Sequence, residues 1–184
     1  SSQYLTALLI AGPLCKQDLK IQITGDLISK PYIDITLKLL SKFGIKYKNN
    51  KWKSFTLSSP SRFKSPRKIK VEGDASSASY FFAAGAIGGL VEVNNINKSS
   101  IQGDLQFLDV IKKMGATIEY LSNSIKVSHE KQLTGMTIDC KNIPDAAMTL
   151  AILALFAKGP TTLKSIGSWR VKETDRILAM KTEL

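Results

Sequence analysis

Apolar residues recur along the chain in patterns that predict a repeated unit of helices and strands. Three stretches are apolar on nearly every side and begin with Ser-Ser or Pro-Asp, which are typical of helix caps and first turns. They are Ser1–Gly12, Ser76–Gly85 and Pro144–Ala151. Because such a helix has no polar face to turn toward water, we expect all three helices to be buried.

Each apolar helix is followed by a strand-like run and then, in two copies, by an amphipathic helix. The runs are Leu19–Thr24, Leu90–Ile96 and Thr161–Ile166. The amphipathic helices carry Ile33, Leu37 and Leu40 in the first copy and Leu105, Leu108 and Ile111 in the second. Gly44 and Gly115 stand where a left-handed helix end is expected, and 115 − 44 puts the period at 71 residues.

Hairpins and extended runs complete the unit. The pattern predicts pairing of residues 45–48 with 52–57 around Asn49-Asn50, and of 117–120 with 124–128 around Ser122-Asn123. The extended runs Arg67–Val71 and Met136–Cys140 lead into the next apolar helices. The unit is therefore β-α-β-α-β-β, an α/β (α+β) class, with one complete copy between two incomplete ones. The Ser/Pro-rich residues 58–66 fit either a passage between lobes or a long loop.

Composition and charge narrow the function classes. The hydrophobic fraction is 43%, and the longest apolar run, Ala146–Ala157, is far shorter than the roughly 20 residues of a membrane span. With no signal peptide visible, we expect a soluble, cytoplasmic protein without a membrane partner. The net charge is +11. Most lysines alternate singly with apolar residues, as on the wet face of a sheet, so small anionic substrates or a lysine-rich surface explain the charge as well as nucleic acid does.

Cysteine and histidine usage argues against metal and triad chemistry. Cys15 and Cys140 lack CxxC spacing, so we expect free buried thiols. His129 is the only histidine and is expected at the surface, which removes histidine triads and most zinc sites. The chain begins without methionine inside one helical pattern and ends inside another, so we expect an internal piece of a longer protein.

Residues 167–176 crowd charges at a predicted helix start. The pattern places Lys172, Glu173 and Arg176 in the first two turns, with Lys172 and Arg176 on one side. Cations are poorly placed at the positive end of a helix dipole, and an anionic ligand would reverse that effect. The alternative is a solvated face on which Glu173 and Asp175 balance the cations.

Other helix starts carry groups suited to anions. Ser1, Ser2 and Gln3 begin the first apolar helix, where free backbone N–H groups hold phosphate readily, although a serine pair also serves simply as a cap. Ser29 and Tyr32 repeat the arrangement at the next helix. Asp145, in the first turn of its helix, is either structural or a base for a hydroxyl group.

Five motifs together resemble the 3-phosphoshikimate 1-carboxyvinyltransferase (5-enolpyruvylshikimate-3-phosphate synthase) family. They are Ser1–Leu9, Ser29–Thr36, Val71–Phe81, Ile143–Thr149 and Trp169–Arg176. The resemblance runs through all 184 residues, in order and at family spacing, and covers somewhat under half of the family's chain. It implies the enolpyruvyl transferase fold of two lobes, with buried helices aimed at the cleft and sheets outside. Residues 1–71 and 72–184 would be incomplete parts of the two lobes.

The resemblance also implies a reaction and its residues. The enolpyruvyl group of phosphoenolpyruvate would pass to the 5-hydroxyl of shikimate 3-phosphate, with no metal or organic cofactor. The shikimate phosphate would be held by Ser1, Ser2 and Ser29, and the rest of that substrate by Gln3, Tyr32, Asp145, Ser168 and Lys172. Phosphoenolpyruvate would be held by Gln3, Glu173 and Arg176. Catalysis would use Asp145 as base, Lys172 beside the hydroxyl and Glu173 as the proton carrier to the methylene carbon.

Ser168 departs from the asparagine usual in the family, which puts one substrate contact in doubt. Within the same fold, an enolpyruvyl transferase acting on UDP-N-acetylglucosamine is the nearest alternative, and a basic nucleic-acid-binding repeat protein is a distant one. The resemblance implies further ligands outside this chain, so we expect the 184 residues alone to be inactive and unstable. The full-length enzyme is expected to be a monomer.

Overall fold

The computed structural model describes residues 2–184. By its internal contacts the chain divides into two compact units, unit 1 (Ser1–Val71) and unit 2 (Glu72–Leu184). Each unit has its own core of buried apolar side chains. That the units belong to two larger lobes stays a prediction.

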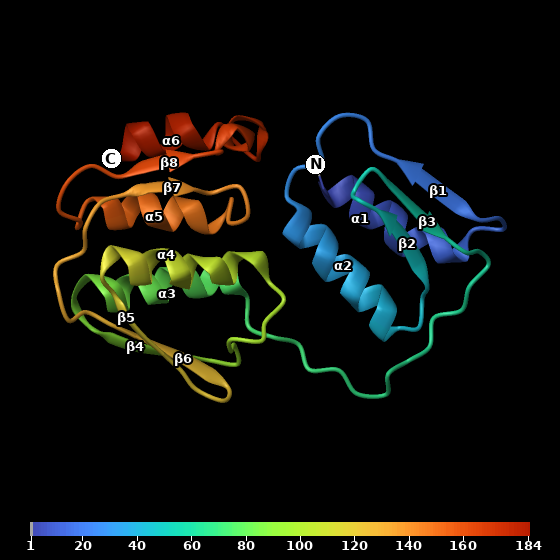
Figure 1. Cartoon of the computed structure of the whole chain (residues 1–184), viewed down its shortest axis with the longest axis horizontal. Helices are drawn as coiled ribbons and strands as arrows, with labels where there is room; N and C mark the ends of the chain where they lie inside the picture. Colours follow the sequence, from blue (N-terminus) through green and yellow to red (C-terminus); the bar gives the residue numbers. More distant parts are fainter. Residues whose placement is uncertain (1) are drawn as a thin grey trace. The chain divides into compact units, whose positions relative to one another are not determined.

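Unit 1 packs two helices against one antiparallel sheet (Figure 1). Its elements are α1 (Ser2–Ala11), the short 3-10 helix η1 (Gly12–Leu14), β1 (Leu19–Gln22), α2 (Lys30–Lys42), β2 (Tyr47–Asn50) and β3 (Ser54–Leu57). β3 lies between β1 and β2 and pairs antiparallel with both. Alternate residues of β3, Phe55 and Leu57, are fully buried in one core with Leu9 of α1 and Ile33 of α2.

Unit 2 begins with the same plan. Its first elements are α3 (Ala75–Gly88), β4 (Leu90–Asn94), η2 (Gly103–Gln106), α4 (Phe107–Met114), β5 (Thr117–Tyr120) and β6 (Ser124–Ser128). The strand order β4-β6-β5 matches β1-β3-β2 of unit 1, because in both sheets the last strand lies in the middle. The predicted order of apolar helix, strand, amphipathic helix and hairpin is therefore confirmed, as is the hairpin of residues 117–128. Among the described residues no strand directly precedes α3, so the predicted complete six-element copy is wrong.

The remainder of unit 2 is a third, partial copy. It contains β7 (Thr137–Asp139), α5 (Ala146–Ala154), β8 (Thr162–Lys164), η3 (Gly167–Val171) and α6 (Arg176–Glu183). β7 and β8 pair in parallel, with α5 in the connection between them. α5 packs against α3, where Ser79 Oγ lies 2.8 Å from Thr149 Oγ1 in the interior. Helices and sheets are thus mixed as the predicted class requires.

Glycine ends both amphipathic helices, as the sequence predicts. Gly44 has φ +75° and Gly115 has φ +124°, which is backbone that residues with a side chain rarely adopt. The next amide, of Ile45 or Ala116, then turns back to a carbonyl of the last helical turn. These two turns direct the chain into the hairpin strands of each repeat.

The predicted turn of the first hairpin is wrong by about two residues. Asn49 and Asn50 belong to β2, and the left-handed backbone falls at Lys51 (φ 49°) and Trp52 (φ 64°). The Asn49 side chain accepts a hydrogen bond from the Trp52 amide at 2.9 Å. Asn49 therefore stabilises the turn from the strand end rather than forming it.

The predicted strand Arg67–Val71 is also wrong. These residues form an exposed connection in which Arg67 has φ 62° and Val71 is 79% exposed. The run carries three cations in four positions, Arg67, Lys68 and Lys70, and such charge favours contact with water over pairing along β4. The first backbone bond to the β4 region comes only at Gly73, whose amide donates to Asn95 O at 2.7 Å.

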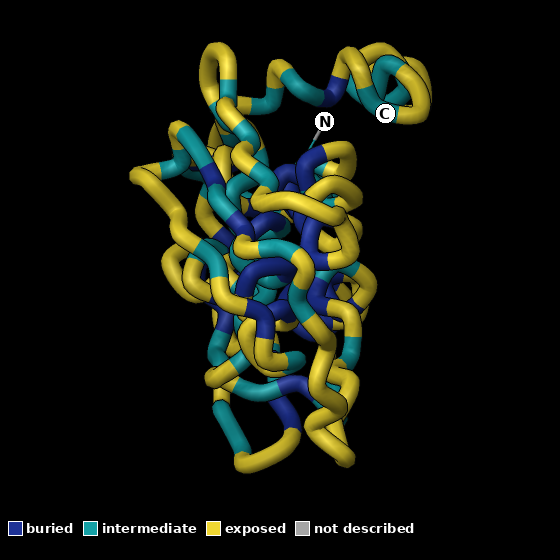
Figure 2. Tube along the Cα trace, turned by 90° about the vertical axis from the view of Figure 1, so that its right-hand side faces the viewer, coloured by how far each residue is buried: buried dark blue, intermediate teal, exposed yellow. Residues whose placement is uncertain are grey.

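The apolar helices are buried on one side only, so the expectation of complete burial is wrong. In α1, Leu5 and Leu9 lie in the core, whereas Tyr4 is 76% exposed. In α3, Phe82 is buried and Phe81 is 60% exposed. Dark and yellow stretches alternate along the trace in Figure 2. An apolar composition permits a helix to be buried on every side. Which side is buried depends on the elements that pack against the helix. Among the described helices, none is long and apolar enough to cross a membrane.

Candidate functional site

Two segments of unit 2 emerge at the same edge of the parallel pair β7 and β8. Residues 140–145 follow β7, and residues 165–176 follow β8. Because the strands are parallel, their carboxyl ends lie side by side, and the segments after them meet there. Ligands of parallel sheets bind outside such carboxyl ends.

Asp145 lies at the junction of the first segment with α5. Its backbone is helical (φ −87°, ψ −43°), and its side chain makes no capping bond to the helix. Instead Oδ1 accepts a hydrogen bond from Arg176 Nη1 at 2.6 Å, and Lys172 Nζ lies 3.6 Å from the same oxygen. One carboxylate oxygen therefore faces two cations from the segment after β8.

The second segment differs from its predicted form. Lys172 is extended (ψ −152°), and α6 begins only at Arg176, so the expectation that Lys172 and Glu173 lie in this helix is wrong. The reason is Asp175, whose Oδ1 accepts from the amides of Ile177 and Leu178, both at 3.1 Å, and so caps α6 at this point. Lys172 and Arg176 still face one way, because the loop between them folds back toward Asp145.

Arg176 is the centre of this cluster. Its side chain is 13% exposed and also grips Glu173 with two bonds, Nε to Oε1 at 2.7 Å and Nη2 to Oε2 at 2.9 Å. The hydrogen bond from Arg176 holds the pKa of Glu173 below its ordinary value of 4.5. Bonds from Glu173 first, and then from Asp145, raise the pKa of Arg176. Glu173 is thus ionised at neutral pH.

The two remaining charges of the segment pair with each other. Asp175 Oδ2 accepts from Arg170 Nη1 at 2.9 Å while Oδ1 caps α6. The alternative in which Glu173 and Asp175 balance nearby cations is thereby observed, but it does not exhaust the site. Lys172 and Arg176 also converge on a carboxylate from another segment, which a solvated helix face does not explain.

The start of α3 lies near this cluster and carries a network of hydrogen-bonded polar side chains. This network was not predicted from the sequence. Asp74 accepts hydrogen bonds from the amides of Ser76 and Ser77. The negative charge of Asp145 is close enough to act on the pKa of Asp74 in the opposite direction to these bonds. Ser76 Oγ donates at 2.5 Å to Asp104, which is 4% exposed. The signal was Asp74 itself, an acidic residue just before an apolar helix. The Ser76-Ser77 pair occupies the first turn, after the cap.

The other predicted site residues lie in unit 1 or in η3. Ser1 lies outside the described residues. Ser2 is the first residue of α1, with Gln3 exposed behind it, and Ser29 is the residue before α2, with φ 56° and no capping bond from its side chain. Tyr32, half-buried, is in the first turn of α2. Ser168 is half-buried in η3, next to the fully buried Trp169.

α1 and α2 pack together, and their starts point to one side of unit 1 (Figure 1). Thr6 Oγ1 and Thr36 Oγ1 lie 3.0 Å apart across this contact, which fixes how the two helices are aligned. The first-turn N–H groups of both helices are therefore presented on the side that carries Ser2 and Ser29.

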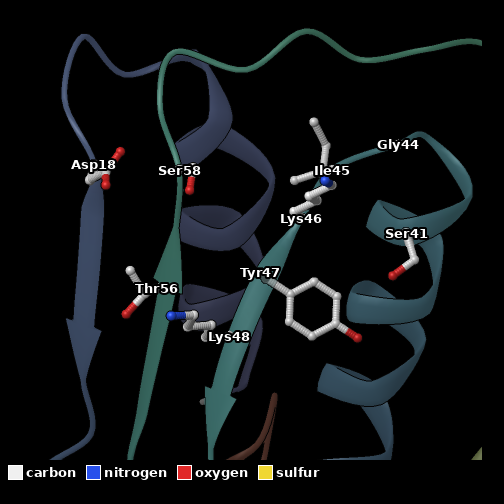
Figure 3. A pocket seen from close by; sticks show the side chains of 9 residues that line it. All are labelled: Asp18, Ser41, Gly44, Ile45, Lys46, Tyr47, Lys48, Thr56 and Ser58. Carbon is white, nitrogen blue, oxygen red and sulfur yellow. The ribbon is translucent and has the colours of Figure 1, made fainter.

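A pocket elsewhere in unit 1 contains none of the predicted site residues (Figure 3). It is lined by Asp18, Ser41, Gly44, Ile45, Lys46, Tyr47, Lys48, Thr56 and Ser58. In the close-up the Tyr47 ring extends from β2 toward α2. Ser41 lies in the last turn of α2 and Gly44 two residues after the helix, and at ~1.5 Å per residue this end lies about 18 Å from the helix start. The pocket is thus remote from Ser29.

The positions of the two cysteines and the histidine agree with the expectations only in part. Cys15 and Cys140 are both free, but Cys15 is exposed, so the expectation that both thiols are buried is wrong. Burial raises the pKa of the Cys140 thiol to about 11. His129 Nδ1 lies 2.8 Å from Ala86 O at the end of α3 and takes no part in the cluster.

The chain has the enolpyruvyl transferase fold, because solved structures of that fold match these repeated units. A solved structure of EPSP synthase from Acinetobacter baumannii matches 99% of this chain with a TM-score of 0.78 at 24% identity, and the match covers 42% of that chain. The enolpyruvyl transferase NikO from Streptomyces tendae matches 88% with a TM-score of 0.63 at 16% identity, covering 39% of its own chain.

The chain belongs to the EPSP synthase (3-phosphoshikimate 1-carboxyvinyltransferase) family, whose model matches residues 1–184. Proteins named 3-phosphoshikimate 1-carboxyvinyltransferase from Shewanella pealeana and Citrobacter koseri are 56% and 55% identical over the whole chain. The chain spans 43% of the length of each of these relatives. The comparisons do not favour the UDP-N-acetylglucosamine or nucleic-acid alternatives.

Proposed function

We propose that the full-length protein containing this chain transfers the enolpyruvyl group of phosphoenolpyruvate to the 5-hydroxyl of shikimate 3-phosphate and releases phosphate. The observation that carries the proposal is the cluster in which Lys172 and Arg176 meet the Asp145 carboxylate, with Glu173 on the other side of Arg176. Family membership and the names of the relatives support it. The proposed reaction would be one step in the synthesis of aromatic compounds in the cytoplasm.

The addition step needs a base and an acid. Asp145 takes the proton of the attacking hydroxyl as the new C–O bond forms at C2 of phosphoenolpyruvate, and Glu173 gives a proton to C3. The tetrahedral intermediate then loses the C3 proton and the C–O bond to phosphate, which restores the enol ether. Lys172, close to Asp145, stabilises negative charge on the attacking oxygen.

The ion pair between Arg176 and Glu173 suggests how Glu173 acquires its proton. While Arg176 grips both oxygens, the pKa of Glu173 stays low and the carboxylate holds no proton at neutral pH. An anionic substrate that engages Arg176 weakens this grip and so raises the proton affinity of Glu173. Binding of phosphoenolpyruvate would thereby prepare its own proton donor.

The remaining residues would hold shikimate 3-phosphate. We propose that Ser1, Ser2 and Ser29 bind its phosphate at the starts of α1 and α2, and that Gln3 and Tyr32 contact the ring, with Gln3 also near phosphoenolpyruvate. Ser168 would contribute a shorter contact than the family's usual asparagine. No metal or organic cofactor is part of the proposal, and a monomeric full-length protein stays a prediction.

The test is phosphate release by the full-length protein with phosphoenolpyruvate and each acceptor in turn. We expect turnover with shikimate 3-phosphate and none with UDP-N-acetylglucosamine. Asp145→Asn should lower kcat by about 10²–10⁴-fold, the contribution of a positioned general base. Asp109→Asn, the same change at an exposed position of α4, should leave kcat unchanged. Absence of turnover with shikimate 3-phosphate, or full activity of Asp145→Asn, refutes the proposal.

A further inference from the structure

We propose that Trp169 is a positioning residue for Asp145, acting through the peptide group that precedes it. The inference rests on the proposed function, because it assigns to Trp169 the task of holding the proposed base opposite its cations. The link from Trp169 to Asp145 runs through the backbone carbonyl of Pro144. The indole thus joins the segment after β7 to the segment after β8.

The first observation is a buried hydrogen bond. Trp169 is 2% exposed and is the largest fully buried side chain in the described residues. Its Nε1 donates to the carbonyl oxygen of Pro144 at 2.7 Å. A buried donor and acceptor that lose each other leave two unsatisfied groups, so this contact resists displacement more strongly than an exposed one.

The second observation is the place of the Pro144 carbonyl in the helix start. The Ala147 amide donates to Ile143 O at 2.9 Å, and the Met148 amide donates to Asp145 O at 3.3 Å. The carbonyl of Pro144 lies between these two acceptors and takes the indole as its donor. Because a peptide group is planar, a bond to the Pro144 carbonyl also fixes the amide and the Cα of Asp145, from which its side chain leaves the backbone.

The third observation is the other end of the link. The Trp169 amide donates to Ile166 O at 2.9 Å and closes the turn of η3. Lys172 follows three residues later and Arg176 seven residues later. One side chain therefore sets the register between the carboxylate and both cations.

The experiment replaces the indole N–H without changing its shape. In the full-length protein, Trp169 is replaced by 3-benzothienylalanine, in which sulfur stands for the N–H group. The same replacement at Trp52, the tryptophan of unit 1, is the matched control. Trp169→Phe is a second variant that also removes the donor, and its thermal unfolding reports the loss of packing separately.

Two readouts are combined. The first is the split between kcat and KM: we expect kcat of the Trp169 isostere to fall by about tenfold to a hundredfold, the effect of misplacing a reacting group by about 1 Å, while KM for both substrates changes by less than about threefold. The second needs no turnover. It is the water-exchange rate of the Arg176 Nη–H protons, which include the donor to Asp145 Oδ1, in a nitrogen-15 spectrum, with Arg62 and Arg67 as internal references. We expect this rate to rise by about tenfold, the equivalent of one lost hydrogen bond.

Support requires both changes at Trp169 and neither at Trp52. A lower unfolding temperature with unchanged kcat and exchange rate assigns Trp169 a packing role alone and overturns the proposal. A change in only one readout also overturns it, because the carboxylate and its cations would then not move together. If the parent protein shows no turnover, the proposed function fails, and the Arg176 exchange rate still decides whether Trp169 holds the cluster.

Discussion

The two units share one fold plan, but unit 1 is strongly basic and unit 2 has no net charge. Unit 1 holds fourteen Lys and Arg against three Asp, so its net charge is 14 − 3 = +11, and unit 2 holds twelve of each sign, 12 − 12 = 0. The whole excess of the chain therefore lies in residues 1–71. Three carboxylates cannot neutralise fourteen cations, whereas in unit 2 every cation has a possible partner.

Equivalent rows of the two sheets show the difference directly. On the solvent face of unit 1, Lys20 and Lys48 flank Thr56 of the central strand. At the same register in unit 2, Glu92 and Glu119 flank Lys126, whose Nζ lies 3.9 and 3.8 Å from their carboxylates. The residues on either side of each central position, Phe55 and Leu57 or Ile125 and Val127, are fully buried.

The inner positions of the two sheets therefore fix this fold, and the outer ones do not. Alternate apolar residues of the central strand determine the register in both sheets. The outer positions are free to carry either sign. In unit 1 they carry lysines, which make a surface that attracts anions. In unit 2 they carry paired charges, as Lys126 shows with Glu92 and Glu119.

The largest effect is expected at Arg176 of unit 2. Arg176→Lys keeps the charge but loses the two-pronged contact to Glu173 and the contact to Asp145, so we expect kcat/KM of the full-length enzyme to fall by about 10²–10³-fold. Arg62→Lys in the exposed connection of unit 1 is the control and should change kcat/KM by less than about twofold, as for a surface charge. Steady-state kinetics with both substrates measure kcat/KM of the two variants. Equal effects of the two variants would remove the distinction between fixed and diffuse charge.

A second prediction compares close packing in the two units. A Cβ at Gly85 in α3 would lie 2.6 Å from the carbonyl oxygen of Val127, which is backbone of β6 and cannot move aside. A Cβ at Gly12 would meet the end of the Leu19 side chain at 2.9 Å, and that side chain can rotate. We expect Gly85→Ala to lower the free energy of unfolding by ~1–3 kcal/mol and Gly12→Ala by clearly less.

Urea unfolding of the full-length protein measures both variants, with Gly88→Ala as a control because nothing lies within 4 Å of its added Cβ. A larger loss for Gly12→Ala than for Gly85→Ala would show that unit 1 is the more rigidly packed unit, contrary to this geometry.

How far the sequence predicts these structures depends on the range of the interaction. Local patterns predicted the repeat, the left-handed glycines and the hairpin around Ser122-Asn123. The Asp175 cap was also readable, since an acidic residue precedes a helical run, and its neglect placed Lys172 and Glu173 in a helix that begins later.

Contacts between segments far apart in the chain were not readable. The bond from Trp169 to the Pro144 carbonyl joins residues 25 apart, and the meeting of Asp145 with Arg176 joins residues 31 apart. Nothing in either local pattern specifies them. The resemblance to a family gathered Asp145, Lys172, Glu173 and Arg176 as candidates, and the parallel pairing of β7 with β8 supplies the physical reason why they meet.

The next largest effect is expected in the stability of the two units toward acid. A hydrogen bond from Arg176 lowers the pKa of Glu173, one from the Leu178 amide lowers that of Asp175, and one from Ser165 lowers that of Asp139. A depressed folded pKa gives stability that is present above the ordinary values of 3.8 to 4.5 and is lost as pH falls through the folded value. All three groups lie in unit 2.

We therefore expect unit 2 to lose structure at a higher pH than unit 1 during acid titration. Each unit has one tryptophan, Trp52 or Trp169, so fluorine-19 spectra of fluorotryptophan-labelled protein report both units at once, with each resonance assigned by a single replacement. Earlier loss of the Trp52 resonance would contradict the prediction. At 1 M salt the separation should shrink for the exposed pairs, because the Debye length falls to about 3 Å.

The smallest effect should come from exchanging the charge pattern of the two sheet rows. Thr56→Glu places a carboxylate between Lys20 and Lys48, as a mirror of the arrangement around Lys126, and should raise the free energy of unfolding by about 0.3–1 kcal/mol. Thr56→Lys adds a third cation to the row and should lower it by a similar amount. Thr56→Gln, with a side chain of the same length as Glu and no charge, separates the effect of charge from that of the longer stem. The difference between Glu and Gln, measured by urea unfolding, should disappear at 1 M salt, where exposed charges are screened. A difference that survives at high salt would mean that packing on the outer face, rather than charge, sets the stability of this row, and the freedom assigned to the outer positions would then be too broad.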